Sequence, residues 1–150
     1  MSQLISQARA LLRGDKKLSS TTNALTVDLE EYFTVQALDE RVPRKRWSNQ
    51  PLRCDRQVKT LLDLFDKHKV SATFFTLGWV AERHPELIRE VHARGHEVAA
   101  HSYWHKLVFD MTPEDFRLDL VRVRDLLQDI IGQSVIGYRA PTYSITKASL

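Results

Sequence analysis

The sequence contains a single cysteine, Cys54, among its 150 residues. One thiol cannot form a disulfide within the chain, and it has no second thiol with which to build a thiolate metal site. Any metal that the chain binds is therefore expected to take its ligands from histidine and carboxylate side chains.

The sequence also lacks a strong charge imbalance and a long apolar run. Its 22 basic and 19 acidic residues leave a net charge of +3, which is too small to indicate a nucleic-acid partner. Residues 1–22 mix short apolar groups with Gln and Arg, so no signal peptide or transmembrane segment is expected there. We interpret them as an N-terminal extension, a frayed helix rather than a helix lying on a membrane, and expect a cytoplasmic protein by default.

Residues 23–150 are interpreted as one globular domain, since the chain is 43% hydrophobic and 27% charged. Apolar, β-branched runs predict strands at residues 24–28, 70–76, 96–100 and 135–138. Helical spacing predicts helices that end near His68, at Gly95 and at Gly132, and the last begins at a Thr112 cap. The basic, proline-broken segment 41–53 is interpreted as a loop. Alternating strands and helices favour a parallel α/β sheet with crossover helices.

Polar residues stand where three of the predicted strands end. Asp28 ends the first strand, His101 follows the third, and Arg139 follows the fourth. Because chemistry in parallel α/β folds collects where strands end and loops begin, these side chains should meet at one edge of the sheet.

His101 and His105 begin and end the segment HSYWH. A loop or helical turn can aim both imidazoles at one ion, and a carboxylate from the first strand would complete a two-histidine, one-carboxylate set. Alone the spacing is a weak signal, because histidines at loop starts often only bond the backbone. Capping or surface exposure explains the remaining histidines, which are His68, His84, His92 and His96.

Three carboxylates, Asp28, Glu30 and Glu31, fall within four positions. One could ligate a metal while another stays free to accept a proton from metal-held water. Alternatively, Glu30 and Glu31 stand at a helix start and favour the positive end of its dipole. The Arg139 guanidinium, followed by the stiff Pro141, suits a fixed contact to a carboxylate or a sugar, with a structural salt bridge as the alternative.

The segments TVDLEE, ATFFTLGW, HSYWH and YRAPTYS occur in this order, and through them the chain resembles the polysaccharide deacetylase family, carbohydrate esterase family four, over about residues 24–149. Its D-x-E-[DE]-[YW]-F opening is most similar to the branch associated with bacterial exopolysaccharide export systems. The resemblance implies a metal-dependent hydrolase, with zinc as the expected ion, that removes N-acetyl groups from an amino-sugar polysaccharide or oligosaccharide.

The resemblance also implies a role for each motif residue. Asp28 matches the catalytic base, and Arg139 matches the arginine that orients it. His101 and His105 match the two metal-binding histidines. The expected substrate contacts are the Thr142 backbone N–H at the oxyanion and the Tyr143 and Trp104 side chains along the groove.

The chain departs from the family's pattern at Leu29, where the usual second aspartate, a metal ligand, would fall. Glu30 is expected to replace it. Some relatives with altered openings work without metal, which keeps a metal-free amidohydrolase acting on non-peptide C–N bonds as an alternative.

A second departure concerns the leucine-histidine element that supplies the general acid, which has no counterpart before Leu150. We therefore expect an α/β fold that is a partial (β/α) barrel with its C-terminal half absent, completed by a longer chain or a partner chain. A non-catalytic glycan-binding remnant is a further alternative. The resemblance to export machinery also points towards the cell envelope.

Overall fold

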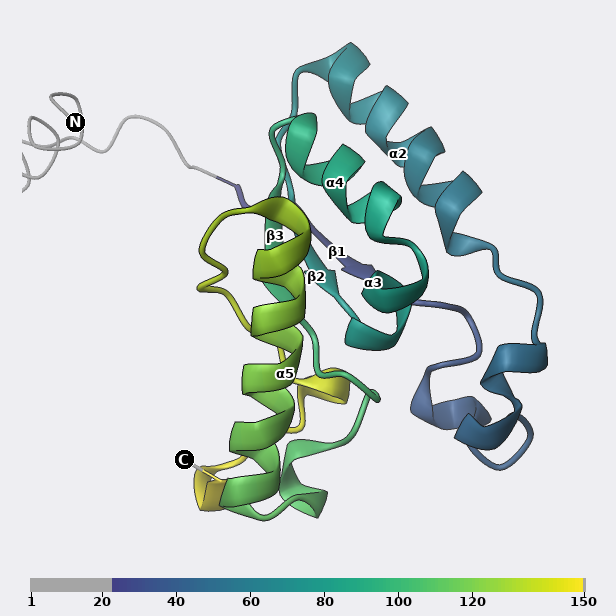
Figure 1. The fold of residues 1–150 in the computed structure, drawn as a ribbon, viewed down its shortest axis with the longest axis vertical. Coiled ribbons are helices and arrows are strands. Elements are labelled where there is room, and N and C mark those ends of the chain that lie inside the picture. Colours follow the sequence, from purple (N-terminus) through teal and green to yellow (C-terminus); the bar gives the residue numbers. More distant parts are fainter. Residues whose placement is uncertain (1–22, 150) are drawn as a thin grey trace, which may run out of the picture.

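The computed structural model describes residues 23–149 and shows a parallel α/β fold (Figure 1). Three strands pair in the order β1-β2-β3, with β1 at Thr26–Leu29, β2 at Thr73–Thr76 and β3 at Glu97–Ala100. Both pairings are parallel. The parallel strands with crossover helices that the sequence predicts are confirmed, while the predicted N-terminal helix lies outside the described residues.

Helices follow each strand along the chain. The α-helices are α2 (Cys54–His68), α3 (Gly78–Arg83), α4 (Pro85–Ala93) and α5 (Pro113–Ile131). The 3-10 helices are η1 (Gln36–Leu38), η2 (Arg44–Asn49), η3 (Val108–Asp110), η4 (Pro141–Tyr143) and η5 (Lys147–Ser149). Local signals set both ends of α5: the Thr112 hydroxyl accepts from the Asp115 N–H at 3.1 Å, and Gly132 has a φ of +69°. No helix within residues 23–149 is long and apolar enough to cross a bilayer.

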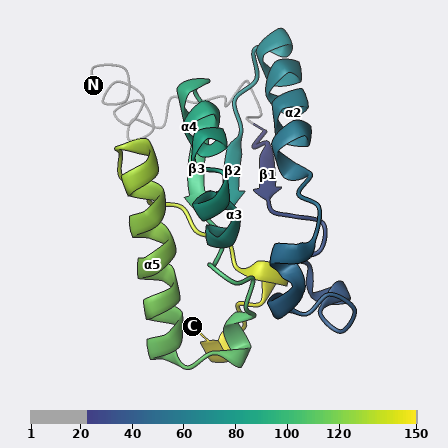
Figure 2. The ribbon, with the colours of Figure 1, turned by 45° about the vertical axis from the view of Figure 1, so that its right-hand side comes forward.

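The sheet has one face covered by helices, since α2, α4 and α5 lie on the same side of it in both views (Figure 1, Figure 2). Leu29 and Phe74 belong to the buried core, and each is at most 1% exposed. Asp28 and Phe75 alternate with them along β1 and β2 and are paired in the sheet register. Strand alternation therefore turns the Asp28 carboxylate away from the helical layer.

The predicted fourth strand, residues 135–138, is wrong, because only Tyr138 pairs there, in an isolated parallel bridge to Ala100. Gly137 permits this close approach, since a Cβ at this position would lie 2.9 Å from the Ala99 side chain. Val135 is buried in the core, but Ile136 remains 89% exposed, so the run that predicted a strand is covered at only some of its positions. The bridge nevertheless brings Arg139, the residue after Tyr138, to the end of β3.

Segment 41–53, predicted as a loop, contains the helix η2. Its Trp47 is fully buried, and the Trp47 ring lies 5.5 Å from that of Trp79 and 5.9 Å from that of Trp104. Phe33 packs on Trp47 and Trp79 from the segment after β1. We call Phe33, Trp47, Trp79 and Trp104 the aromatic cluster. Burial of a large ring orders a segment whose charge and prolines predicted a solvated loop.

His96, predicted to be exposed or to act as a cap, is only 4% exposed. Its ring packs against Phe65 and Phe74, and its Nδ1 accepts a hydrogen bond from the Ala72 N–H at 3.2 Å. This histidine is therefore part of the core.

Candidate active site

Asp28 and Glu30 are delivered by the end of β1. Asp28 lies within the strand, and Glu30 follows its last residue, Leu29. Side chains two residues apart in an extended chain point to the same side, so the two carboxylates share a face while Leu29 points into the core. This alternation explains why position 30, and not position 29, supplies the second carboxylate.

His101 and His105 lie on the segment that follows β3. The His101 N–H donates to the Thr76 carbonyl at 3.0 Å, which extends the strand pairing by one residue. Ser102, with a φ of +61°, and His105, with a φ of +55°, adopt the left-handed conformation that side-chain-bearing residues rarely occupy. Each such residue costs about 1–3 kcal/mol, and strain of this kind is concentrated at functional sites.

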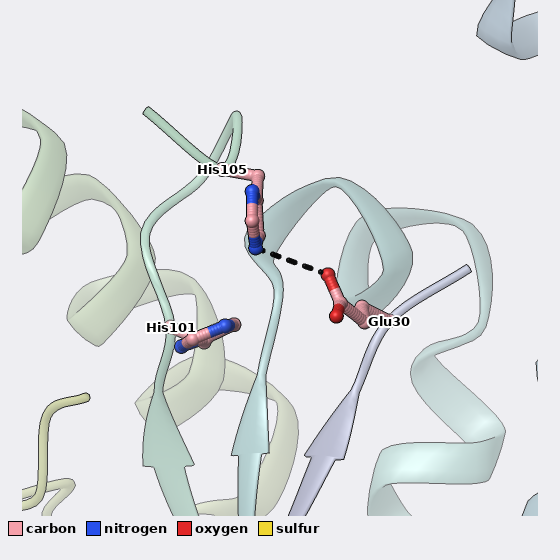
Figure 3. Close-up of side chains that lie close together, drawn as sticks. All are labelled: Glu30, His101 and His105. Atoms are coloured by element: carbon pink, nitrogen blue, oxygen red, sulfur yellow. Dashed lines mark ion pairs between the residues drawn. The ribbon is translucent and has the colours of Figure 1, made fainter. Parts of the chain in front are cut away.

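Glu30, His101 and His105 converge from β1 and from the segment after β3 (Figure 3). One potential ligand atom from each lies within 4.8 Å of the others, and His105 Nε2 is 3.3 Å from Glu30 Oε2. Both histidines are buried, and the Glu30 side chain is only 18% exposed. The structure thus brings together the three residues that the sequence predicted as metal ligands.

Burial keeps the two imidazoles neutral. Desolvation is the main cause that lowers the pKa of His105 to about 4, and the neighbouring His101 lowers it further. Desolvation also lowers the pKa of His101. His101 Nδ1 lies 2.9 Å from the Arg139 carbonyl oxygen. Because a carbonyl can only accept, Nδ1 carries the proton and Nε2 keeps its lone pair. Both histidines are therefore prepared to act as ligands.

A divalent cation fits this set of donors. Burial raises the pKa of Glu30 to about 7, opposed by the Thr34 hydroxyl, which donates to Glu30 Oε2 at 3.0 Å. A positive ion between this carboxylate and two neutral imidazoles would favour the ionised form of Glu30. The Thr34 and Arg139 contacts also fix the orientation of Glu30 and His101, as outer partners of metal ligands typically do.

Asp28 is held by Arg139. Arg139 Nη1 donates to Asp28 Oδ1 at 2.5 Å, and Nη2 donates to the Thr26 hydroxyl at 2.8 Å. The guanidinium carbon also lies 4.0 Å from the centre of the Phe75 ring, on the face of the sheet opposite the helices. The Asp28 side chain keeps 33% of its surface exposed. Its carboxylate is therefore oriented yet accessible.

Glu31 has a different role from Glu30. It is 1% exposed, and its carboxylate accepts from the backbone N–H of Arg53 at 2.8 Å and of Cys54 at 3.0 Å. These are the free N–H groups at the start of α2, where negative charge is favoured. No helix begins at Glu30 or Glu31, so the interpretation as a local helix start is wrong. Glu31 instead caps a helix that starts more than 20 residues later.

The three predicted substrate residues lie in different surroundings. Thr142 and Tyr143 both have left-handed backbone conformations, and Tyr143 is 82% exposed. Among residues 23–149, no hydrogen-bond partner is found for the Thr142 N–H. Trp104 is half-buried, with its ring packed against Tyr103 and Trp47. Their contacts with a substrate stay predictions.

Sequence reasoning missed three residues around the site. Thr26 accepts from Arg139 and lies two positions before Asp28, a spacing that could have identified it. Thr34 and Arg44 carry no such signal. Arg44 lines a cavity of about 190 Å³ beside His105, and its charge helps to lower the pKa of that histidine.

The polysaccharide deacetylase family model matches residues 50–150. The chain is 28% identical over 90 residues to the peptidoglycan-N-acetylglucosamine deacetylase of Bacillus cereus, a match that covers 60% of this chain and 33% of that protein. It is 33% identical over 89 residues to the peptidoglycan deacetylase of Helicobacter pylori, with 59% and 30% covered. The chain thus spans about a third of the length of these curated relatives.

Solved structures agree with the fold. A Mycobacterium smegmatis protein assigned to the polysaccharide deacetylases superposes with a TM-score of 0.70 at 28% identity, over 84% of this chain and 45% of that one. A Bacillus anthracis protein described as a CE4 family pseudoenzyme superposes with a TM-score of 0.61 at 22% identity, over 63% of this chain and 34% of that one. The second likeness concerns the fold alone.

Proposed function

Because the chain belongs to the polysaccharide deacetylase family, we propose that it is a metal-dependent hydrolase that removes N-acetyl groups from an amino-sugar polymer. The observation that carries this proposal is the buried Glu30–His101–His105 cluster, which lies beside a carboxylate, Asp28, whose charge also raises the pKa of Glu30. Such a set offers a metal position and a separate proton acceptor.

Zinc is the ion that we propose, because two imidazoles and one carboxylate form a donor set typical of catalytic zinc sites. When bound, the ion would hold and acidify the attacking water and polarise the acetyl carbonyl. Glu30, His101 and His105 would be its ligands. Their burial excludes bulk water, which strengthens the electrostatic interactions inside the site.

Asp28 would accept the proton from the attacking water. Arg139 donates hydrogen bonds to both Asp28 and Thr26, and these two contacts hold the Asp28 carboxylate in one orientation. General bases positioned in this way contribute about 10²–10⁴ in rate. The Thr142 N–H, which has no hydrogen-bond partner within residues 23–149, supports its proposed role as a donor to the acetyl oxygen that becomes the oxyanion.

The proposed substrate is an N-acetylated polysaccharide or oligosaccharide, since the relatives are named as deacetylases of peptidoglycan and of chitooligosaccharides. The opening DLEEYF, residues 28–33, supports the finer proposal that the polymer is an exopolysaccharide. Loss of deacetylated sugars from the exopolysaccharide of a deletion strain would test it. The cytoplasmic location also stays a proposal, which cell fractionation would test.

The direct test measures acetate release from N-acetylated oligosaccharides by the metal-free protein and after addition of zinc. We expect activity to depend on added metal and to disappear in His101→Ala together with His105→Ala. His68→Ala, which changes an exposed histidine at the end of α2, is the matched control and should retain activity.

Each other outcome identifies a different function. Acetate release that survives a chelator would contradict the metal-dependent mechanism and favour a metal-free amidohydrolase. Saturable glycan binding without any acetate release would favour a binding domain, with Tyr143 as its exposed aromatic side chain.

A further inference from the structure

A second group of potential metal ligands shares no residue with the first. Glu31, Cys54 and His84 each place one potential ligand atom within 4.8 Å of the others. Glu31 follows β1, Cys54 is the first residue of α2, and His84 joins α3 to α4. The deacetylation chemistry proposed above uses none of these side chains.

The group is enclosed in the fold. Glu31 is 1% exposed and Cys54 is 3% exposed. His84 Nε2 is shielded from solvent and has no hydrogen-bond partner within residues 23–149. Buried polar atoms in folded proteins are nearly always paired, so a shielded imidazole nitrogen close to a thiol and a carboxylate indicates a missing partner.

The carboxylate is already oriented. The N–H groups of Arg53 and Cys54 fix Glu31 at 2.8 Å and 3.0 Å, and a carboxylate oxygen pair has lone pairs to spare beyond these contacts. Ligand carboxylates in metal sites are typically held by such outer hydrogen bonds. Burial is the main cause that raises the pKa of the Cys54 thiol, and the neighbouring Glu31 carboxylate raises it further. The thiol therefore keeps its proton until a cation replaces it.

We propose that Glu31, Cys54 and His84 form a second metal site that binds zinc or a similarly thiophilic divalent ion. Sulfur, imidazole and carboxylate ligands together select such ions over magnesium or calcium. The ion would join the end of β1, the start of α2 and the junction of α3 and α4, three segments that are far apart in the sequence. The single cysteine led us to expect only histidine and carboxylate ligands, because a thiolate-rich site needs several thiols, whereas the mixed site that we propose would need only one.

Cobalt provides the test, because thiolate-to-cobalt charge transfer absorbs in the near ultraviolet and requires a cysteine ligand. Titration of Co²⁺ into the metal-free chain should produce this band in the wild type. The band should persist in His101→Ala with His105→Ala and be absent in Cys54→Ser. Zinc binding measured by equilibrium dialysis should fall by one equivalent per chain in Cys54→Ser and in His84→Ala, and should be unchanged in His68→Ala.

A wild type that is folded but gives no charge-transfer band would overturn the proposal, as would unchanged zinc stoichiometry in Cys54→Ser. Circular dichroism checks the fold of each variant. If Cys54→Ser does not fold, His84→Gln replaces it, and retention of the full zinc stoichiometry there would count equally against the site. Failure of the Glu30–His101–His105 site would leave the charge-transfer band in place, so the two proposals are tested separately.

Discussion

Glu31→Gln in the metal-free protein isolates the contribution of a buried charge to the start of α2. The change keeps the size of the side chain but makes its contacts to the Arg53 and Cys54 N–H groups neutral. Hydrogen bonds to charged groups contribute about 1.5–3 kcal/mol against about 0.5–1.5 for neutral ones, so roughly 1 kcal/mol is lost per contact. Loss of the helix-dipole interaction adds about 0.3–1 kcal/mol. The free energy of unfolding should therefore fall by about 2–3 kcal/mol.

Urea denaturation followed by circular dichroism, with a chelator present, measures this change, and the slope against urea should stay constant while the midpoint moves. Glu30→Gln is the matched control. Glu30 accepts a side-chain hydrogen bond from Thr34, and burial already disfavours its charge, so the same substitution should change the free energy of unfolding by less than about 1 kcal/mol. Equal losses in the two variants, or a loss below about 0.5 kcal/mol in Glu31→Gln, would refute the assignment of Glu31 as the cap of α2.

Three further predictions concern other parts of the fold. Trp47→Ala should lower the free energy of unfolding by about 3–5 kcal/mol in urea denaturation, because the ring is fully buried, and the half-buried Trp104→Ala should lose less. Burial lowers the pKa of His96 below 6.5, so its neutral form stabilises the fold above that pH and this contribution is lost as the pH falls. Urea midpoints should therefore drop more steeply from about pH 7 to about pH 5 in the wild type than in His96→Asn, and parallel curves would contradict this. Asp28→Asn should reduce the rate of acetate release by about 10²–10⁴ while zinc affinity stays within a few-fold, and a retained rate would exclude Asp28 as the base.

Local patterns predicted the elements that local forces decide. Thr112 and Gly132 mark the ends of α5 through a side-chain cap and a left-handed residue, both of which act over a few positions. The meeting of Asp28, His101 and Arg139 also followed from sequence, because parallel strands bring their ends to one edge, whereas the choice of Glu30 as a ligand came from the resemblance to the deacetylase family. The chemical roles of these residues stay predictions.

Tertiary contacts decided what the sequence could not show. Residues 135–138 have the composition of a strand, yet they pair with β3 only through a single bridge at Tyr138. Glu31 finds its helix more than 20 residues away, which no local acidic pattern could indicate. Trp47 and His96 are buried because distant aromatic rings surround them, although a basic, proline-broken segment predicted a loop around Trp47 and a position at a strand start predicted exposure or capping for His96.

The contacts of Arg139 imply that the parts of the site form one after another during folding. The residues proposed to hold the metal all lie before position 106, so they can meet once the chain has folded through β3. Asp28 and Arg139 are 111 positions apart in the sequence. The Arg139 carbonyl, which sets the His101 tautomer, reaches the site together with the Arg139 side chain. Loop closure over such a separation comes late in folding. The three proposed ligands can therefore meet before Arg139 orients Asp28, so the two parts of the proposed site form in sequence rather than together.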